Sequence, residues 1–378
     1  MNRSLLGGLS PAEFLHRHWQ KRPLLVHAAL PDFAGAIDLP KLQQLAGRHD
    51  CESRLVIRDH NRWHVEHGPF PRRAFRQLPE RGWTLLVQGV ERFVPAAQSL
   101  LGLFSFIPYA RLDDLMVSYA PTGGGVGPHF DSYDVFLLQG EGRRRWKIST
   151  QRDLDLVPDA PLKILRRFRP EGVCTLGPGD MLYLPPRIAH DGVAIEDCFT
   201  CSIGFRAPDN RDLAAAFLAY IEDRLNVAGI YADPDLTPQR RPAQLPSRMI
   251  AQAERVLTGI RWGRKDVIDF LGCHLTEPKP VVTFSRPERP RFGEFSREVQ
   301  ASSVELAPAS RMLVYGPALF LNGESFRIRS EHQALFAELA DRRRVTTARI
   351  RWPAASMHLL YRWYVDGYIL VSGQQAEA

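Results

Sequence analysis

The sequence predicts an α+β protein in which an antiparallel β-sandwich or barrel is flanked by helical segments. Two observations support this fold class: short β-like runs are separated by Gly- and Pro-rich turns, and the apolar spacing becomes helical after Pro208. Many short strands joined by such turns are typical of sandwiches and barrels, and not of parallel α/β sheets. The predicted strands of this core are 115–119, 134–138, 144–148, 172–176, 181–184 and 198–205.

The residues before this core are expected to add a helix and three further strands. Ser10-Pro11-Ala12-Glu13 is a capping-box pattern with proline in the first turn, so a helix is expected from there to about residue 21. Alternating apolar residues predict a hairpin from 54–58 and 62–66, and another strand at 83–87.

Helices and a small α+β unit are expected after the core. Apolar residues at helical spacing predict helical segments over 210–224 and 247–275, and prolines mark a connector after each. The C-terminal unit is expected to contain two strands near 312–328, helices near 331–341 and 353–364, and a final strand at 368–371.

The composition is that of a soluble globular protein with two or three domains. The 378 residues are 44% hydrophobic and 24% charged, and no apolar run is long enough to cross a membrane. The N-terminus lacks the pattern of a signal peptide, so we expect a cytoplasmic protein.

Five scattered cysteines argue against a disulfide framework, and Cys198 and Cys201 are expected to be buried structural residues. The net charge of +7 permits a nucleic-acid partner, but a solvated Arg-rich surface is the simpler explanation.

The segment Gly127-Pro128-His129-Phe130-Asp131, together with the distant His190, is the strongest functional signal in the chain. Side chains alternate along a strand, so His129 and Asp131 are expected to point to the same side of a sheet. His190 is expected on a loop that follows the strand ended by Pro185-Pro186. A single histidine is more often structural, but two histidines and a carboxylate with open positions are the ligand set of non-haem Fe(II) oxygenases.

A second signal is the basic run at 143–148. Alternation places Arg144 on the same face as Trp146 and Ile148, so we expect the Arg144 guanidinium to be buried. A buried guanidinium is costly unless it is paired, and the strand has no carboxylate on that face. A dicarboxylate co-substrate would supply a bidentate partner. The alternatives are an ion pair with a remote carboxylate, or a run of arginines that lies wholly on the surface.

The segment 92–210 resembles the JmjC branch of the cupin superfamily. The motifs that carry the resemblance are G-G-G-V-G-P-H-F-D-S-Y-D-V-F, G-R-R-R-W, P-G-D-M-L-Y-L-P-P with the later histidine, and S-I-G-F-R-A-P. The run F-L-H-R-H-W-Q-K-R-P, which starts at Phe14, resembles the opening of the bacterial ribosomal oxygenases. The resemblance implies an α+β fold with a double-stranded β-helix core. The implied divisions are 1–91 for a flanking N-terminal region, 92–210 for the catalytic domain, 211–280 for a helical dimerisation region and 281–378 for a winged-helix-like domain.

The resemblance also implies an Fe(II)- and 2-oxoglutarate-dependent protein hydroxylase that uses O₂. By matching position, the iron ligands would be His129, Asp131 and His190. The residues implied to bind 2-oxoglutarate are Arg144 at the distal carboxylate, Ser118 beside it, and Thr200 or Ser202. Bacterial members of the group hydroxylate the β-carbon of an arginine in ribosomal protein sixteen of the large subunit. The helices at 211–225 and 247–275 would form a homodimer interface.

A cationic substrate side chain needs acidic or aromatic partners near the mouth of the site. Tyr133 and Asp134, beside the ligands, are candidates, and so are Asp113 and Asp114; each could equally be a loop-cap or surface residue. The C-terminal unit resembles a winged helix, but its basic stretch 342–344 lies in a predicted turn, so direct DNA binding is not expected.

Other functions remain open at this point. The same chemistry could act on a histidine of another ribosomal protein. A non-catalytic cupin with a winged helix that binds ribosomal RNA is an alternative from a different class. A cupin isomerase ranks last, because such enzymes usually have a histidine pair where this chain has His129-Phe130-Asp131.

Overall fold

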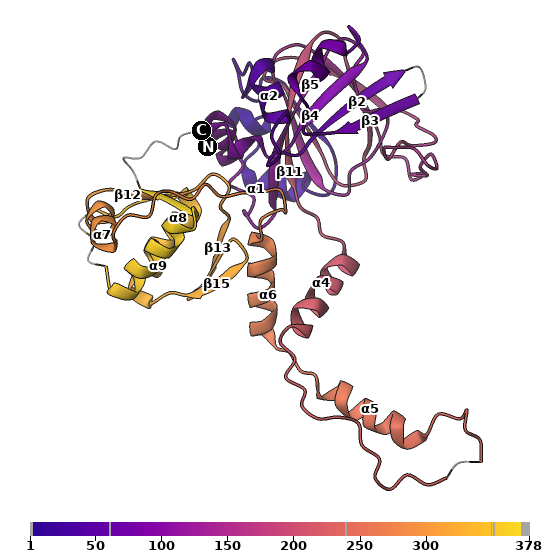
Figure 1. The fold of residues 1–378 in the computed structure, drawn as a ribbon. Coiled ribbons are helices and arrows are strands. Elements are labelled where there is room, and N and C mark those ends of the chain that lie inside the picture. The colour runs from indigo at the N-terminus through magenta and orange to yellow at the C-terminus, as the bar shows by residue number, and fades with distance from the viewer. Residues whose placement is uncertain (1–2, 60–61, 239, 349, 351, 372–378) are drawn as a thin grey trace.

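The computed structural model describes residues 3–371 except 60–61, 239, 349 and 351, and its core is a pair of antiparallel sheets (Figure 1). The eight-stranded sheet has the order β1 (Leu24–Val26), β9 (Met181–Leu184), β6 (Asp134–Gln139), β11 (Cys198–Phe205), β5 (Leu112–Ala120), β4 (Trp83–Val87), β2 (Ser53–Asp59) and β3 (Arg62–His67). The three-stranded sheet has the order β10 (Ala189–Ala194), β7 (Arg144–Ser149) and β8 (Gly172–Leu176). The double-stranded β-helix that the sequence predicted is confirmed.

The two faces of the large sheet bury different cores because side chains alternate along each strand. Val135 and Leu137 of β6 pack with Trp146 of β7, which fills the space between the two sheets. Phe136 and Leu138 of β6 belong to the larger core on the opposite face. The helices that cover this face are α1 (Pro11–Arg17), α2 (Leu39–Ala46) and α3 (Pro95–Gly102). The face between the sheets is therefore the one that can hold a site.

The N-terminal helix is capped as predicted but is shorter. The Glu13 N–H donates to Ser10 Oγ at 3.2 Å, and the Ser10 N–H donates to Glu13 Oε2 at 2.9 Å. The helix ends at Arg17, before the predicted residue 21, and Gln20 has a left-handed φ of 55° that no α-helix contains. The predicted hairpin is formed by β2 and β3, and its turn at 60–61 lies outside the described residues.

The first of the two helical segments predicted after the core is a single helix, and the second is divided into two. They are α4 (Asn210–Glu222), α5 (Ser247–Gly259) and α6 (Arg264–Thr276). The predicted block 247–275 is interrupted at 260–263, where Ile260 leaves the helical conformation with ψ 121°. In Figure 1, α5 lies at the end of an arm, away from both the barrel and the C-terminal unit. Helix α6 instead packs on the C-terminal sheet so closely that a Cβ on Gly272 would overlap the Phe320 ring.

The C-terminal unit contains two three-stranded sheets with helices between them. One sheet is β13 (Met312–Tyr315), β14 (Ala318–Leu321) and β15 (Glu324–Arg327), so the region near 312–328 has three strands and not the predicted two. The other is β16 (Arg344–Thr346), β12 (Ser303–Leu306) and β17 (Ile369–Val371). The helices are α7 (Phe292–Ala301), α8 (Gln333–Arg342) and α9 (Ala354–Val365). Short 3₁₀ turns are η1 (Arg3–Leu6), η2 (Arg72–Gln77), η3 (Val90–Arg92) and η4 (Ser330–His332).

Two expectations from composition can be compared with the structure. All five cysteines are free, and both Cys198 and Cys201 are buried. Among the described residues, none of the helices combines the length and the apolar character that a bilayer crossing requires.

Candidate functional site

His129, Asp131 and His190 converge on one point. One ligand atom from each of them lies within 4.8 Å of the other two. The backbones of His129 and His190 exchange hydrogen bonds, with N···O distances of 2.9 and 2.8 Å. Residues that exchange hydrogen bonds in this way lie directly opposite each other, with their side chains on the same face. The three predicted ligands are therefore brought together by backbone pairing as well as by sequence position.

The local structures that carry these side chains differ from the predicted ones. His129 and Asp131 do not lie on a regular strand; His129 makes an isolated bridge to β10. Gly127, with φ 84°, turns the chain just before this bridge, and a Cβ there would lie 2.8 Å from the Trp63 ring. His190 lies on strand β10 and not on a loop. Its neighbours Ala, Asp and Gly have low β-propensity, which explains why the strand was not predicted.

Hydrogen bonds fix the orientation of both imidazoles. His129 Nδ1 lies 2.9 Å from the Gly127 carbonyl oxygen, and His190 Nδ1 lies 2.9 Å from the Ile188 carbonyl oxygen. A carbonyl only accepts, so each Nδ1 carries a proton and Nε2 is the ring nitrogen left for a metal. His190 Nε2 lies 3.6 Å from Asp131 Oδ2. The hydrogen bonds therefore orient both rings with Nε2 as the candidate ligand atom.

The electrostatic environment of His190 also suits metal binding. Burial, with a smaller contribution from His129, lowers the pKa of His190 to about 4. The imidazole is therefore neutral near pH 7, which is the state that a metal ligand needs. In the part of the chain that the structure describes, this is the one group of three or more His, Cys, Asp or Glu side chains close enough to share a metal. Two neutral imidazoles and one carboxylate fit Fe(II) and leave coordination positions open.

Arg144 lies on the same interior face of the barrel as His190. Its side chain is 5% exposed, and its Nε and Nη2 have no hydrogen-bond partner among the described residues. Strand β7 pairs with β10 so that Ile148 is opposite His190 and Arg144 is opposite Ala194. Opposed residues share a face, so Arg144 and His190 face the same space, about 13 Å apart along the strand. A small dicarboxylate can bridge that span between a metal and a guanidinium that extends toward it.

Trp146 lies between Arg144 and the candidate metal ligand His190. It is opposite Gly192 on β10, its ring centroid is 5.9 Å from that of His190, and the Arg144 guanidinium carbon is 5.8 Å from its ring. A Cβ on Gly192 would come within 2.5 Å of the indole, so only glycine fits opposite this tryptophan. The indole forms one wall of the space between the metal ligands and Arg144.

Ser118, Thr200 and Ser202 lie on the interior face of the large sheet and are all buried. Ser118 of β5 is paired with Thr200 of β11, and Thr200 is in turn paired with Gln139 of β6. The Thr200 hydroxyl donates to Gln139 Oε1 at 3.1 Å, while Gln139 Nε2 donates to the Phe199 carbonyl oxygen at 2.8 Å. Gln139 was not considered from the sequence; its position at alternate spacing after buried Val135 and Leu137 was the available signal.

The candidate substrate residues occupy different environments. Tyr133 is 38% exposed, and a Cβ on Gly204 would lie 3.8 Å from its ring. Asp134 is fully buried on the opposite face of β6. Its carboxylate accepts from the Tyr183 hydroxyl at 2.6 Å and from Gln20 Nε2 at 2.9 Å. This geometry makes Asp134 an anchor for the N-terminal segment, which leaves Tyr133 as the exposed candidate.

Asp113 and Asp114, at the start of β5, are paired with a lysine of the segment that follows α6. Lys279 Nζ lies 3.2 Å from Asp113 Oδ1 and 2.9 Å from Asp114 Oδ2. Both carboxylates are therefore paired within the protein.

Comparison with known proteins identifies the domains. The JmjC domain family matches residues 99–213, and the ROXA-like winged helix family matches residues 259–369. The latter match includes α6, in agreement with its packing on the C-terminal sheet.

Relatives match most of the chain. The ribosomal protein uL16 3-hydroxylase of Escherichia coli is 35% identical over 334 residues, which cover 87% of this chain and 88% of that protein. The probable ribosomal oxygenase of Haemophilus influenzae is 37% identical over 252 residues, or 65% of this chain and 59% of that protein.

Solved structures agree with this assignment. The X-ray structure of E. coli YcfD has a TM-score of 0.84 and 31% identity, over 96% of this chain and 98% of that chain. The structure of YcfD in complex with cobalt and 2-oxoglutarate has a TM-score of 0.81 and 30% identity, over 97% and 99% of the two chains. With its His-Asp-His cluster inside a JmjC barrel and a winged helix behind it, this chain belongs to the ribosomal oxygenase family.

Proposed function

We propose that this protein is an Fe(II)- and 2-oxoglutarate-dependent oxygenase that hydroxylates the β-carbon of an arginine in ribosomal protein uL16. The observation that carries the chemistry is the buried Arg144 guanidinium, which lies on the same interior face as the proposed metal ligands and has two nitrogens without a hydrogen-bond partner among the described residues. A dianionic co-substrate would satisfy both the guanidinium and a metal. The target is supported by the name of the E. coli relative, a ribosomal protein uL16 3-hydroxylase.

In this mechanism His129, Asp131 and His190 would hold Fe(II). The bound metal, with 2-oxoglutarate and O₂, supplies oxidative decarboxylation to succinate and CO₂ and the insertion of one oxygen atom into a C–H bond. The protein provides orientation and a dry cavity. The two Nδ1–carbonyl hydrogen bonds hold the imidazoles at a fixed angle.

The co-substrate pocket is assigned to the interior polar residues. Arg144 would bind the distal carboxylate with its two unpaired nitrogens, and Ser118 lies on the facing sheet as a second donor. The Thr200 hydroxyl hydrogen is used by Gln139, so Thr200 would act as an acceptor or as a wall, and Ser202 lies one pleat further along β11. The Trp146 ring excludes water between the metal ligands and Arg144.

Substrate contact is assigned to Tyr133. It is two residues from the ligand Asp131 and is partly exposed, so its aromatic face is available to a substrate guanidinium. Tyr133→Ala should raise the KM for the protein substrate and leave the KM for 2-oxoglutarate unchanged. Equal changes in both constants would place Tyr133 in the pocket structure and not at the substrate.

The proposed working form is a cytoplasmic homodimer held together by the helical arm. No residue of α5 is buried, and its exposed apolar residues recur at helical spacing: Met249, Ile250, Val256 and Leu257. Such an apolar face on an extended arm needs a cover, and the proposed cover is the arm of a second copy. Leu257→Asp, at a side chain that is 64% exposed, should convert a dimer into a monomer in sedimentation equilibrium. A monomeric unmodified protein would contradict the dimer.

The function is tested by incubating the iron-loaded protein with 2-oxoglutarate, O₂ and recombinant uL16. The expected result is a gain of one oxygen atom in the mass of uL16, located to an arginine by fragment analysis, with succinate released in equal amount. The control is the His129→Ala, His190→Ala double variant, which should do neither. A modified histidine on another ribosomal protein would keep the chemistry and change the target. No oxygen addition and no succinate from the iron-loaded protein would refute the proposal.

A further inference from the structure

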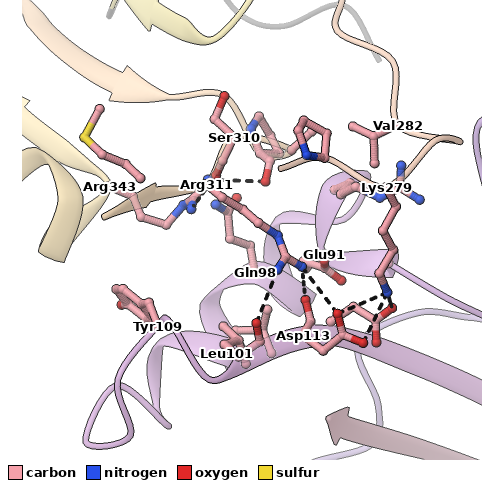
Figure 2. Close-up of a pocket in the computed structure, with 18 of the residues that line it drawn as sticks. Glu91, Gln98, Leu101, Tyr109, Asp113, Lys279, Val282, Ser310, Arg311 and Arg343 are labelled. Carbon is pink, nitrogen blue, oxygen red and sulfur yellow. Dashed lines mark hydrogen bonds and ion pairs between the residues drawn. The ribbon is translucent and has the colours of Figure 1, made fainter. Parts of the chain in front are cut away.

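A cavity of about 120 Å³ separates the barrel from the C-terminal unit, and a charge cluster forms one side of it (Figure 2). The carboxylates of the cluster come from the start of β5. Its cations come from the end of β11, from the linker after α6 and from the start of β13. In Figure 2, Arg311 and Lys279 extend from the C-terminal side to Asp113 on the barrel. The cluster therefore joins two units of the fold.

Asp113 is the centre of the cluster. Its carboxylate accepts from Arg206 Nε at 3.1 Å and from Lys279 Nζ at 3.2 Å, and it lies 3.8 Å from Arg311 Nη2. Asp114 accepts from the same Lys279 Nζ at 2.9 Å. Lys279 thus bridges two neighbouring carboxylates.

The cations also bind backbone on both sides of the joint. Arg206 Nη1 donates to the Leu275 carbonyl oxygen at the end of α6, at 3.2 Å. Arg311 Nη1 donates to the Leu112 carbonyl oxygen at 3.3 Å, and its Nη2 donates to the Asp113 carbonyl oxygen. The hydrogen bonds of Arg311 go directly to the backbone of β5, so the start of β13 cannot move without disturbing that strand.

The cluster is buried enough for its pairs to matter. Asp114 is 8% exposed, and Asp113, Arg206, Lys279 and Arg311 are each about two-thirds or more covered. Surface ion pairs contribute little, but removing one partner of a buried pair costs about 3–5 kcal/mol because the other charge is left without a counter-ion. The partly covered pairs here fall between these limits, so the two units are expected to move as one body.

The two strands tied by the cluster are those that carry the serines and threonine of the proposed pocket. β5 continues from Asp114 to Ser118, and β11 runs from Thr200 through Ser202 to its end just before Arg206. Ser118 and Thr200 are paired across these strands. A shift at the cluster end of this strand pair can therefore reach the pocket end along the paired strands, across an irregularity in register between Ile203 and Phe205.

We propose that Lys279 and Arg311 form a latch through which the winged-helix domain positions β5 and β11 at the co-substrate pocket. They are positioning residues for the reaction although they lie outside the pocket. This inference rests on the proposed 2-oxoglutarate chemistry, because the pocket it affects is the one assigned to that co-substrate. The coupling passes through a buried ion-pair network and a paired set of strands, which are the physical elements that transmit such effects.

The test uses full-length Arg311→Gln and Lys279→Met, with Arg329→Gln as the matched control because Arg329 is an exposed arginine of the same domain. We expect the KM for 2-oxoglutarate to rise about 3- to 10-fold in both latch variants, with kcat changed less than about twofold. Lys279→Arg should restore the KM, because it keeps the charge between Asp113 and Asp114. The control should behave as the unmodified protein.

Hydrogen exchange on the same proteins supplies a readout that needs no turnover. The amides of β5 and β11 should exchange faster in Lys279→Met and Arg311→Gln, and at the unmodified rate in Arg329→Gln. Unchanged exchange in the latch variants, or faster exchange with an unchanged KM, would overturn the latch. If the unmodified iron-loaded protein releases no succinate, the proposed function fails, and the inference that depends on it is overturned with it. If Arg311→Gln does not fold, the exchange rates and KM of Lys279→Met decide between these outcomes.

Discussion

Replacing Arg144 by methionine tests the proposed co-substrate pocket, because the change should affect protein stability and 2-oxoglutarate affinity in opposite senses. The guanidinium is always charged, is 5% exposed, and has two nitrogens without a hydrogen-bond partner in the described structure. Methionine keeps much of the side-chain length and removes the charge. We therefore expect the protein without co-substrate to become more stable, and the affinity for 2-oxoglutarate to fall.

The two magnitudes follow from the burial and from the lost contacts. Replacing buried charge by an apolar side chain of similar size stabilises proteins by about 1–4 kcal/mol. For a chain of this length, a gain of about 1–4 kcal/mol raises the melting temperature by roughly 1–5 °C. Hydrogen bonds to a charged group contribute about 1.5–3 kcal/mol, so the KM for 2-oxoglutarate should rise about 10- to 150-fold.

Thermal unfolding and steady-state kinetics measure the two effects on the same preparation. Arg145→Met is the control, because Arg145 is the next residue on β7, is exposed, and faces away from the cavity. It should change neither quantity. A fall in melting temperature together with an unchanged KM would refute the reasoning, because it would mean that Arg144 already has a structural partner.

Three further outcomes are expected. Burial, and then the charge of Asp114, raise the pKa of Glu91 from 4.5 to about 7. Between these two values the folded state keeps a proton that the unfolded chain releases, so the free energy of unfolding should fall as the pH rises from about 4.5 to 7. Urea unfolding should show this fall, and Glu91→Gln should remove it and stabilise the protein at pH 8 by roughly 1–3 kcal/mol. Gly192→Ala places a Cβ against the Trp146 ring and should cost about 1–3 kcal/mol by the same assay while raising the KM for 2-oxoglutarate. Asp131→Asn should abolish the rise in melting temperature on adding Fe(II) or Co(II) under anaerobic conditions, a rise worth about 3 kcal/mol at a hundredfold excess over Kd.

The sequence predicted the strands whose residue types favour strands and missed those whose stability comes from tertiary contacts. The run 198–205 is rich in apolar residues and coincides with β11. Strand β10 has the sequence Ala-His-Asp-Gly-Val-Ala and forms because β7 and the segment around His129 supply hydrogen-bond partners on both sides. Those partners are distant in the sequence, so local propensity could not indicate the strand.

The roles of polar residues were predictable where the residue type itself indicates the role. They were not predictable where the role depends on a partner that is remote in the sequence. His129, Asp131 and His190 were predicted as metal ligands because few residue types bind iron, and the structure brings them together. Asp113 and Asp114 were considered for substrate binding because the sequence does not reveal their partner. That partner, Lys279, is 166 residues from Asp113, and no local pattern joins them. Asp134 was considered for the same reason, and its partners Tyr183 and Gln20 also come from remote parts of the chain.

Among the described residues of this barrel, some buried polar side chains have hydrogen-bond partners in the protein and others do not, and this difference supports the proposed position of the co-substrate. Asp134, Asp113 and Thr200 have their hydrogen bonds supplied by neighbouring residues, so they stabilise the fold. Unpaired indoles such as that of Trp363 are neutral, and the cost of leaving them unpaired is modest. Arg343 also has an unpaired Nε, but both of its Nη groups donate to carbonyl oxygens. Arg144 differs because it is a buried cation with two nitrogens that lack an acceptor among the described residues, which is why we propose an anionic co-substrate as its partner.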